Sequence, residues 1–235
     1  PDEKYGASPV VSPGVLPDES PDETSDESPD ESPVECPVKI SHEKFDMLKK
    51  LDLSCLDVSN VKDLSNCFIG LKVLEYLNVS DWNVSNVNSL SGCFRNCNSL
   101  CSLDLSHWDV SNVVDMSDCF CNCSSLTSLK IDTWNTSNVN NLEGCFIECY
   151  CLKSLNITDW DVSNVTNLNK CFTECKPLRS LDISKWDISN VITMKECFHD
   201  CHNLCTLNLP KDASKVENMS GCFDGCRSLK RISGI

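Results

Sequence analysis

The sequence predicts an α/β repeat solenoid, in which short turns of chain stack on one another around a shared core. A Ser-Asn-Val motif returns every 26 residues, apolar residues recur at matching places, and a degenerate copy, Ser214-Lys215-Val216, arrives one residue early. The regular copies begin at Ser59, Ser85, Ser111, Ser137, Ser163 and Ser189. A fixed period of this length is typical of a solenoid, because one unit cannot bury its apolar face alone.

The N-terminal segment has a different composition. We expect residues 1–37 to form an acidic, Pro/Asp/Glu/Ser-rich extended arm and residues 38–235 to form the solenoid. Residues 1–36 hold eleven acidic side chains and one lysine, which is −10 of the total formal charge of −15. Proline is concentrated here and favours extended geometry. A chain with this much negative charge repels nucleic acid and anionic lipid. No apolar run in the sequence is long enough to span a membrane.

A short strand is expected to open each repeat. Leu103 and Leu105 alternate with polar residues, which is the period of a strand with one buried face. The equivalent pairs are Leu77/Val79, Leu129/Ile131, Leu155/Ile157, Leu181/Ile183 and Leu207/Leu209. We expect these strands to pair with their neighbours in one parallel β-sheet.

A turn and a tryptophan follow each strand. The tryptophans form one column, Trp82, Trp108, Trp134, Trp160 and Trp186. Periodic tryptophans serve as carbohydrate platforms or as core, and in a stack of turns we favour core. Asp109 and its equivalents suit a turn closed by side chain–backbone hydrogen bonds. The asparagine of each Ser-Asn-Val is expected to form a ladder that satisfies backbone groups at the bend.

The second half of each repeat is expected to be a short helix. Val113, Met116, Cys119 and Phe120 are spaced by 3, 3 and 1 residues, which fits one to two helical turns. The predicted unit is therefore strand, turn, short helix and loop.

The full pattern is Leu-x-Leu-Ser-x-Trp-Asp-Val-Ser-Asn-Val-x-x-Met-x-x-Cys-Phe-x-x-Cys-x-Ser-Leu. It resembles the BspA-type leucine-rich repeats of surface proteins over roughly residues 48–235. The resemblance implies a leucine-rich-repeat-like stack of about seven turns in a secreted or surface-attached protein with a role in adhesion. One departure is that cysteine precedes phenylalanine where the family commonly has methionine.

Cysteine is abundant, with 19 in 235 residues, as in secreted proteins stabilised by disulfides. Two columns hold Cys67, Cys93, Cys119, Cys145, Cys171, Cys197 and Cys222, and Cys97, Cys123, Cys149, Cys175, Cys201 and Cys226. They are either small buried hydrophobes or disulfide candidates, and we favour disulfides. Pairing within a repeat (Cys93–Cys97) and between turns (Cys97–Cys119) both stay open. Because the count is odd, one cysteine is free or intermolecular, and Cys36 is the first candidate.

Glycosylation sequons point to the same compartment. The candidate acceptors are Asn78, Asn83, Asn122, Asn135, Asn156 and Asn218. A further sequon at Asn164 coincides with the asparagine ladder and is interpreted as accidental. We therefore expect an extracellular, secreted or cell-surface glycoprotein.

The two ends of the stack are the expected assembly edges. Leu229, Ile232 and Ile235 lie in the strand of a new turn, and Leu48, Leu51 and Leu53 already match the repeat columns. An uncapped edge is a template for another chain, and a head-to-tail contact that does not close gives a filament. The alternative is a fragment whose cap is missing.

Little in the sequence suggests catalysis. Only the run from His199 to His202 has metal-ligand spacing, and it occurs in one repeat, so we expect no metal, no cofactor and no enzyme. The first functional hypothesis is a structural protein that assembles with copies of itself into an extracellular fibre or surface layer. The alternative is a monomeric adhesin or ligand-binding module for matrix or host-surface ligands.

Overall fold

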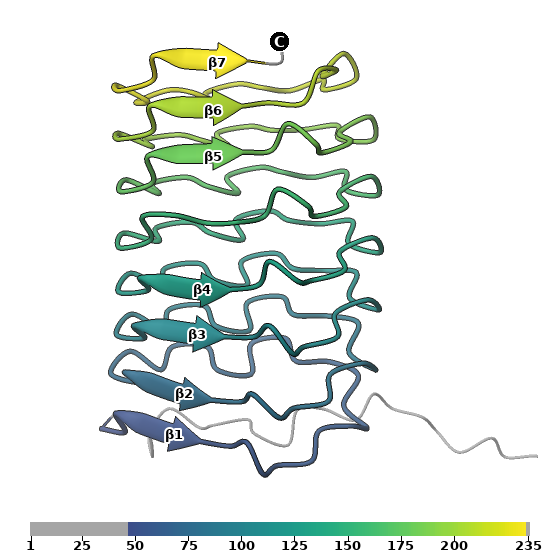
Figure 1. Ribbon diagram of the computed structural model, residues 1–235, viewed down its shortest axis with the longest axis vertical. Coiled ribbons are helices and arrows are strands. Elements are labelled where there is room, and N and C mark those ends of the chain that lie inside the picture. The colour runs from purple at the N-terminus through teal and green to yellow at the C-terminus, as the bar shows by residue number, and fades with distance from the viewer. Residues whose placement is uncertain (1–46, 234–235) are drawn as a thin grey trace, which may run out of the picture. The chain divides into compact units, whose positions relative to one another are not determined.

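The computed structural model describes residues 47–233, which form a stack of turns with short strands along one side (Figure 1). The seven strands are β1 (Lys50–Asp52), β2 (Tyr76–Asn78), β3 (Ser102–Asp104), β4 (Ser128–Lys130), β5 (Ser180–Asp182), β6 (Thr206–Asn208) and β7 (Arg231–Ser233). The described residues thus form the expected leucine-rich-repeat-like solenoid. The predicted boundary between residues 37 and 38 lies outside them.

The strands pair in parallel, with the central apolar residues of paired strands aligned, as Leu51 is with Leu77 and Leu207 is with Ile232. They form three separate sheets, β1–β2, β3–β4 and β5–β6–β7. The prediction of one sheet is therefore corrected. The turn that carries Leu155 and Ile157 keeps both side chains buried but forms no strand. Side-chain alternation predicted the core correctly, but the backbone ladder is interrupted there.

A second ladder runs along another side of the stack. Isolated parallel bridges connect equivalent residues of successive turns without a break, from Asp63 through Ser89 and Asp115 to Asn218. This second ladder therefore also connects those neighbouring turns whose strands do not pair.

The predicted short helix is absent from the described residues. In its place, alternate N–H groups donate to the next turn, as Asn66 does to Ser91, Phe68 to Cys93 and Gly70 to Arg95, at 2.7–2.8 Å. These N–H groups are not available for the i to i−4 bonds of a helix. Asn66 and Gly70 also have positive φ angles of 58° and 74°, which helical geometry forbids. The apolar spacing that suggested a helix arises instead from consecutive tight turns.

Aromatic columns fill the core. Phe68, Phe94, Phe120, Phe146, Phe172, Phe198 and Phe223 stack on one another with ring centroids 5.3–5.8 Å apart. The five tryptophans are only 2–3% exposed, so the prediction that they are core is confirmed. Each indole Nε1 donates to a carbonyl 29 residues earlier, as Trp134 does to Leu105 at 2.9 Å. Residues 47–233 contain no helical segment that could span a bilayer.

Candidate functional site

Each Ser-Asn-Val bend is closed by the acidic or amide residue that precedes it. The side-chain oxygen of Asp109 accepts the backbone N–H of Ser111 at 3.0 Å, and Asn135 accepts that of Ser137 at 3.2 Å. The predicted side chain–backbone turn is confirmed. For Asp187, hydrogen bonds from the backbone and side chain of Ser189 are the main cause of a lowered pKa.

The asparagines of the bends form the predicted ladder. Each Nδ2 donates to the serine carbonyl of the preceding turn, as Asn164 does to Ser137 and Asn190 does to Ser163, both at 2.7 Å. The side chains are exposed, so each Oδ1 faces solvent as a free acceptor. The ladder is therefore both a structural device and a row of polar groups on the surface.

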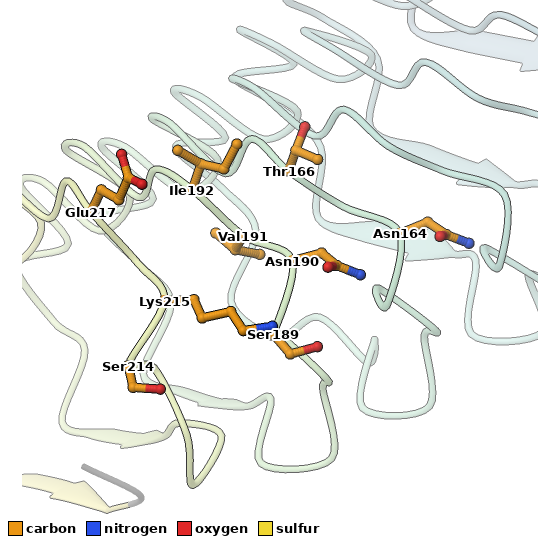
Figure 2. A pocket seen from close by; sticks show the side chains of 9 residues that line it. All are labelled: Asn164, Thr166, Ser189, Asn190, Val191, Ile192, Ser214, Lys215 and Glu217. Carbon is orange, nitrogen blue, oxygen red and sulfur yellow. The ribbon is translucent and has the colours of Figure 1, made fainter.

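This ladder ends in the degenerate seventh repeat, where Lys215 replaces asparagine. A groove of about 650 Å³ lies at this point, and it is lined by Asn164, Thr166, Ser189, Asn190, Val191, Ile192, Ser214, Lys215 and Glu217. Figure 2 shows Asn164 and Asn190 on successive turns, with the Lys215 side chain running toward Ser189.

The groove combines two charged groups with an apolar patch. Neither Lys215 nor Glu217 forms an ion pair within the described residues. Lys215 adds a smaller contribution to the lowered pKa of Asp187 and of Asp212, whose main causes are the hydrogen bonds from Ser189 and Ser214. Ile192 is 50% exposed. These groups can hold a ligand by charge, by amide and hydroxyl hydrogen bonds, and by apolar contact.

Sequence reasoning missed this groove. The degenerate Ser214-Lys215-Val216 copy breaks the period and also places a charge where the other repeats carry the ladder amide. The useful signal was the replacement of a ladder amide by an ammonium group, which can donate but extends further from the backbone.

The sequon asparagines fall into two groups. Asn83, Asn135, Asn156 and Asn218 are exposed, and their Nδ2 atoms make no hydrogen bond within the described residues. Nδ2 of Asn78 donates to Asp52 and that of Asn122 to Asn96, both at 3.1 Å. Glycosylation at Asn78 or Asn122 would break these bonds. Asn164 uses its Nδ2 in the ladder.

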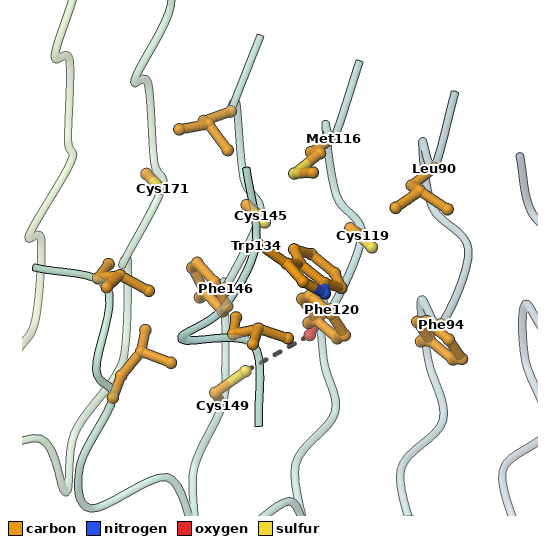
Figure 3. Packing of buried hydrophobic residues seen from close by; sticks show 14 of the residues in the cluster. Leu90, Phe94, Met116, Cys119, Phe120, Trp134, Cys145, Phe146, Cys149 and Cys171 are labelled. Atoms are coloured by element: carbon orange, nitrogen blue, oxygen red, sulfur yellow. Dashed lines mark hydrogen bonds between the residues drawn. The ribbon is translucent and has the colours of Figure 1, made fainter. Parts of the chain in front are cut away.

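The column cysteines are free thiols except Cys67, which is disulfide-bonded. Neither predicted pairing scheme is formed among the free ones, namely Cys93, Cys97, Cys119, Cys123, Cys145, Cys149, Cys171, Cys175, Cys197, Cys201, Cys222 and Cys226. The second column has another role. Its Sγ donates to a buried phenylalanine carbonyl of the preceding turn, as Cys149 does to Phe120 at 3.4 Å (Figure 3). Burial raises the pKa of Cys97 to about 12, so the thiol stays protonated as a donor. Cys36 lies outside the described residues.

The predicted assembly edges are partly apolar surface. Leu48, Leu51, Leu53 and Leu229 are half-buried and pack against the core. Ile232 is 37% exposed. Ile235 lies outside the described residues.

Around the histidines, His199 Nε2 and His202 Nε2 both approach the carboxylate of Asp200, at 3.5 Å and 3.3 Å. The neighbouring Cys201 is buried, and its Sγ donates to the Phe172 carbonyl at 3.0 Å. No group of three metal-ligating side chains is assembled within residues 47–233.

Comparison with known proteins gives one family match. The family described as "Mycoplasma protein of unknown function, DUF285" matches residues 40–129 and 115–233. No curated protein matches significantly.

Several solved structures are similar. They include a TLR13–ssRNA13 complex (20% identity, 78% of this chain and 24% of that chain, TM-score 0.42). A leucine-rich repeat protein from Bacteroides ovatus has 15% identity over 78% of this chain and 60% of its own, with a TM-score of 0.30. An internalin (inlF) from Listeria monocytogenes has 18% identity over 68% of this chain and 48% of its own, with a TM-score of 0.34. The chain thus spans less than two thirds of each of them.

Proposed function

The chain belongs to the DUF285 family. We propose that it is a non-enzymatic binding module that holds an extended peptide segment of a protein partner. The observation that carries the proposal is the groove at residues 164–217. There, the unpaired charges of Lys215 and Glu217 and the exposed Ile192 line one surface. An extended peptide offers all three complements, namely an acidic, a basic and an apolar side chain.

The asparagine ladder supports the same class of ligand. Asn164 and Asn190 lie on successive turns, about 4.8 Å apart in a parallel ladder, and each keeps Oδ1 free. These oxygens can accept peptide N–H groups along the groove. Because Lys215 and Glu217 are exposed to solvent, we expect modest affinity that depends on salt.

The test is selection from a random peptide library against the full chain and a charge-swapped variant, Lys215→Glu with Glu217→Lys. Peptides selected by the natural chain should carry an acidic and a basic residue in a fixed order. The swapped variant should bind them at least about tenfold more weakly and select the reverse order. Lys72→Glu, which changes an exposed lysine far from the groove, should bind like the natural chain. Unchanged selection by the swapped variant would contradict the proposal.

Head-to-tail self-association is a second candidate, because every turn presents the same apolar columns to its neighbour, as Phe198 does to Phe223 with ring centroids 5.8 Å apart. The half-buried Leu48, Leu51 and Leu53 of a second copy would supply matching columns for a fibre or surface layer. Sedimentation velocity tests this. Concentration-dependent growth that Ile232→Lys abolishes would support it, and a single monomeric species at all concentrations would exclude it.

We further propose an extracellular, glycosylated protein, on the strength of the exposed sequons at Asn83, Asn135, Asn156 and Asn218. The free thiols give this location no support. Expression through a secretory pathway, followed by intact mass with and without glycosidase, tests it. A mass loss that Asn83→Gln and Asn135→Gln reduce is expected, and an unmodified mass would contradict glycosylation.

A further inference from the structure

A second groove lies beside the strands, far along the sequence from the acidic segment. It has a volume of about 430 Å³ and is lined by Lys153, Pro177, Arg179 and Asn203. Lys153 and Arg179 occupy the same position in successive repeats, 26 residues apart, and both are exposed.

The two cations of this groove have no counter-charge. Neither Lys153 nor Arg179 forms an ion pair within the described residues. Other lysines of the neighbouring turns are paired, namely Lys130 with Asp104, Lys176 with Glu174 and Lys185 with Asp159. Like charges on adjacent turns repel, and here they are left together on a chain with a net charge of −15. An anion between them would remove this repulsion.

The backbone ladder is broken at the same place. In five turns the N–H at this position donates to the equivalent carbonyl of the turn before, for example from Thr127 to Cys101 at 2.9 Å and from Cys205 to Arg179 at 2.8 Å. The two bonds that would join Lys153 to Thr127 and Arg179 to Lys153 are absent. The N–H groups of residues 153–156 have no acceptor within the described residues.

One lining residue, Pro177, has no N–H and offers only its carbonyl to a neighbour. Of the N–H groups without a protein acceptor, that of Lys153 belongs to a residue that lines the groove, so it is available to a ligand.

We propose that this groove binds a tetrahedral oxyanion, sulfate or phosphate, carried by a small ligand. Arg179 presents a forked set of donors to two oxygens, Lys153 supplies a second positive charge, and the Asn203 amide supplies a neutral donor. The free backbone N–H of Lys153 adds a donor from the same lining residue. The groove is larger than a single oxyanion, so it leaves room for the group that bears it, such as a sulfated sugar. The acidity of the rest of the chain disfavours long polyanions.

Calorimetric titration of the full chain with inorganic sulfate, inorganic phosphate and a sulfated disaccharide tests this. Saturable binding with a dissociation constant of about 1 mM or tighter is expected for at least one probe. Binding of the disaccharide but not of the free ions identifies a sugar-borne sulfate as the source. Equal affinity for the free ions and for the disaccharide identifies the free anion as the ligand.

Variants decide whether binding occurs in this groove. Arg179→Gln should weaken it about tenfold, and Lys153→Gln with Arg179→Gln should abolish it. Lys72→Gln, which removes the same charge at an exposed site in another turn, should bind like the natural chain. Circular dichroism and the melting temperature without ligand show whether each variant is folded. Failure of all three probes to bind, or equal loss with Lys72→Gln, would overturn the proposal.

Discussion

At the scale of single residues, polar side chains of this solenoid are fixed by carbonyls of the turn before. Indole Nε1, cysteine Sγ and asparagine Nδ2 each reach a backbone oxygen 27–29 residues earlier, as in Trp108 to Val79, Cys123 to Phe94 and Asn112 to Ser85. The Val79 and Phe94 carbonyls are reached by buried bonds, so their donors prevent the cost of unsatisfied buried acceptors, whereas the asparagine bonds lie at the surface. A column of side chains that lies beside backbone carbonyls of the preceding turn therefore needs a residue type with a hydrogen-bond donor.

The two cysteine columns give a first prediction. Serine keeps a donor for the Phe120 carbonyl at position 149, whereas the side chain of Cys119 makes no hydrogen bond within the described residues. Cys119→Ser should therefore destabilise the fold by about 1–3 kcal/mol more than Cys149→Ser, because it buries a hydroxyl without a partner. Urea unfolding measures the difference. Equal losses would show that the Sγ–carbonyl bond is unimportant.

The asparagine ladder gives a second prediction at this scale. Asn138→Ala removes a 2.6 Å bond to the Ser111 carbonyl and should cost about 0.5–1.5 kcal/mol of unfolding free energy. Asn60 stands at the start of the column and makes no such bond within the described residues, so Asn60→Ala is the matched control and should cost less. Thermal unfolding of both variants compares them, and a larger loss for Asn60→Ala would refute the ladder's role.

Residue patterns predicted those features that one repeat determines by itself. The buried tryptophans, the side chain–backbone turns and the asparagine ladder all follow from a residue type at a fixed place. The state of the cysteines could not be predicted, because a thiol donor and a disulfide leave the same column in the sequence. The groove at Lys215 depends on a departure from the repeat, and a repeat pattern predicts only the features that its copies share.

At the scale of elements, tight turns replace the predicted helices. Spacings of 3, 3 and 1 put side chains on one face both in a helix and in a chain of turns, so periodicity alone could not separate them. The distinguishing signal is the residue type at the left-handed positions, which are Asn66, Gly92, Asp118, Gly144, Lys170, Glu196 and Gly221 in chain order. Glycine and asparagine are favoured at positive φ, but lysine and glutamate conceal the pattern.

These left-handed positions couple neighbouring turns, and Gly144 gives the third prediction. A Cβ on Gly144, whose φ is 63°, would meet the Asp118 side chain of the turn before and the Ile147 side chain. Gly144→Ala should cost about 1–3 kcal/mol of unfolding free energy through backbone strain and this clash. The cost should fall when Asp118 is also replaced by alanine, because the two sites are in contact. A double-mutant cycle by urea unfolding measures this coupling, and strict additivity would argue against the contact.

At the scale of the whole described stack, the acidic turn residues make stability depend on pH in one direction. Hydrogen bonds donated by Ser111, Ser163 and Ser189 lower the pKa of Asp109, Asp161 and Asp187. Bonds from Lys130 and Ser106 lower that of Asp104 to about 2. Burial raises the pKa of Asp118, which acts in the opposite sense, but this one site opposes a column of lowered ones.

The sign follows from linkage. A carboxyl group with a lower pKa in the folded state stabilises the fold at pH values above its ordinary pKa, near 4. That stability is lost as the pH falls through the folded pKa, so the melting temperature should drop between about pH 5 and pH 2. The repeat offers a matched control, since Asn83 and Asn135 close the same turn without titrating. A triple variant, Asp109→Asn with Asp161→Asn and Asp187→Asn, should therefore fold alike at neutral pH and show a shallower acid dependence. Melting curves followed by circular dichroism at low salt measure both slopes, and parallel slopes would mean that the acid sensitivity arises elsewhere in the chain.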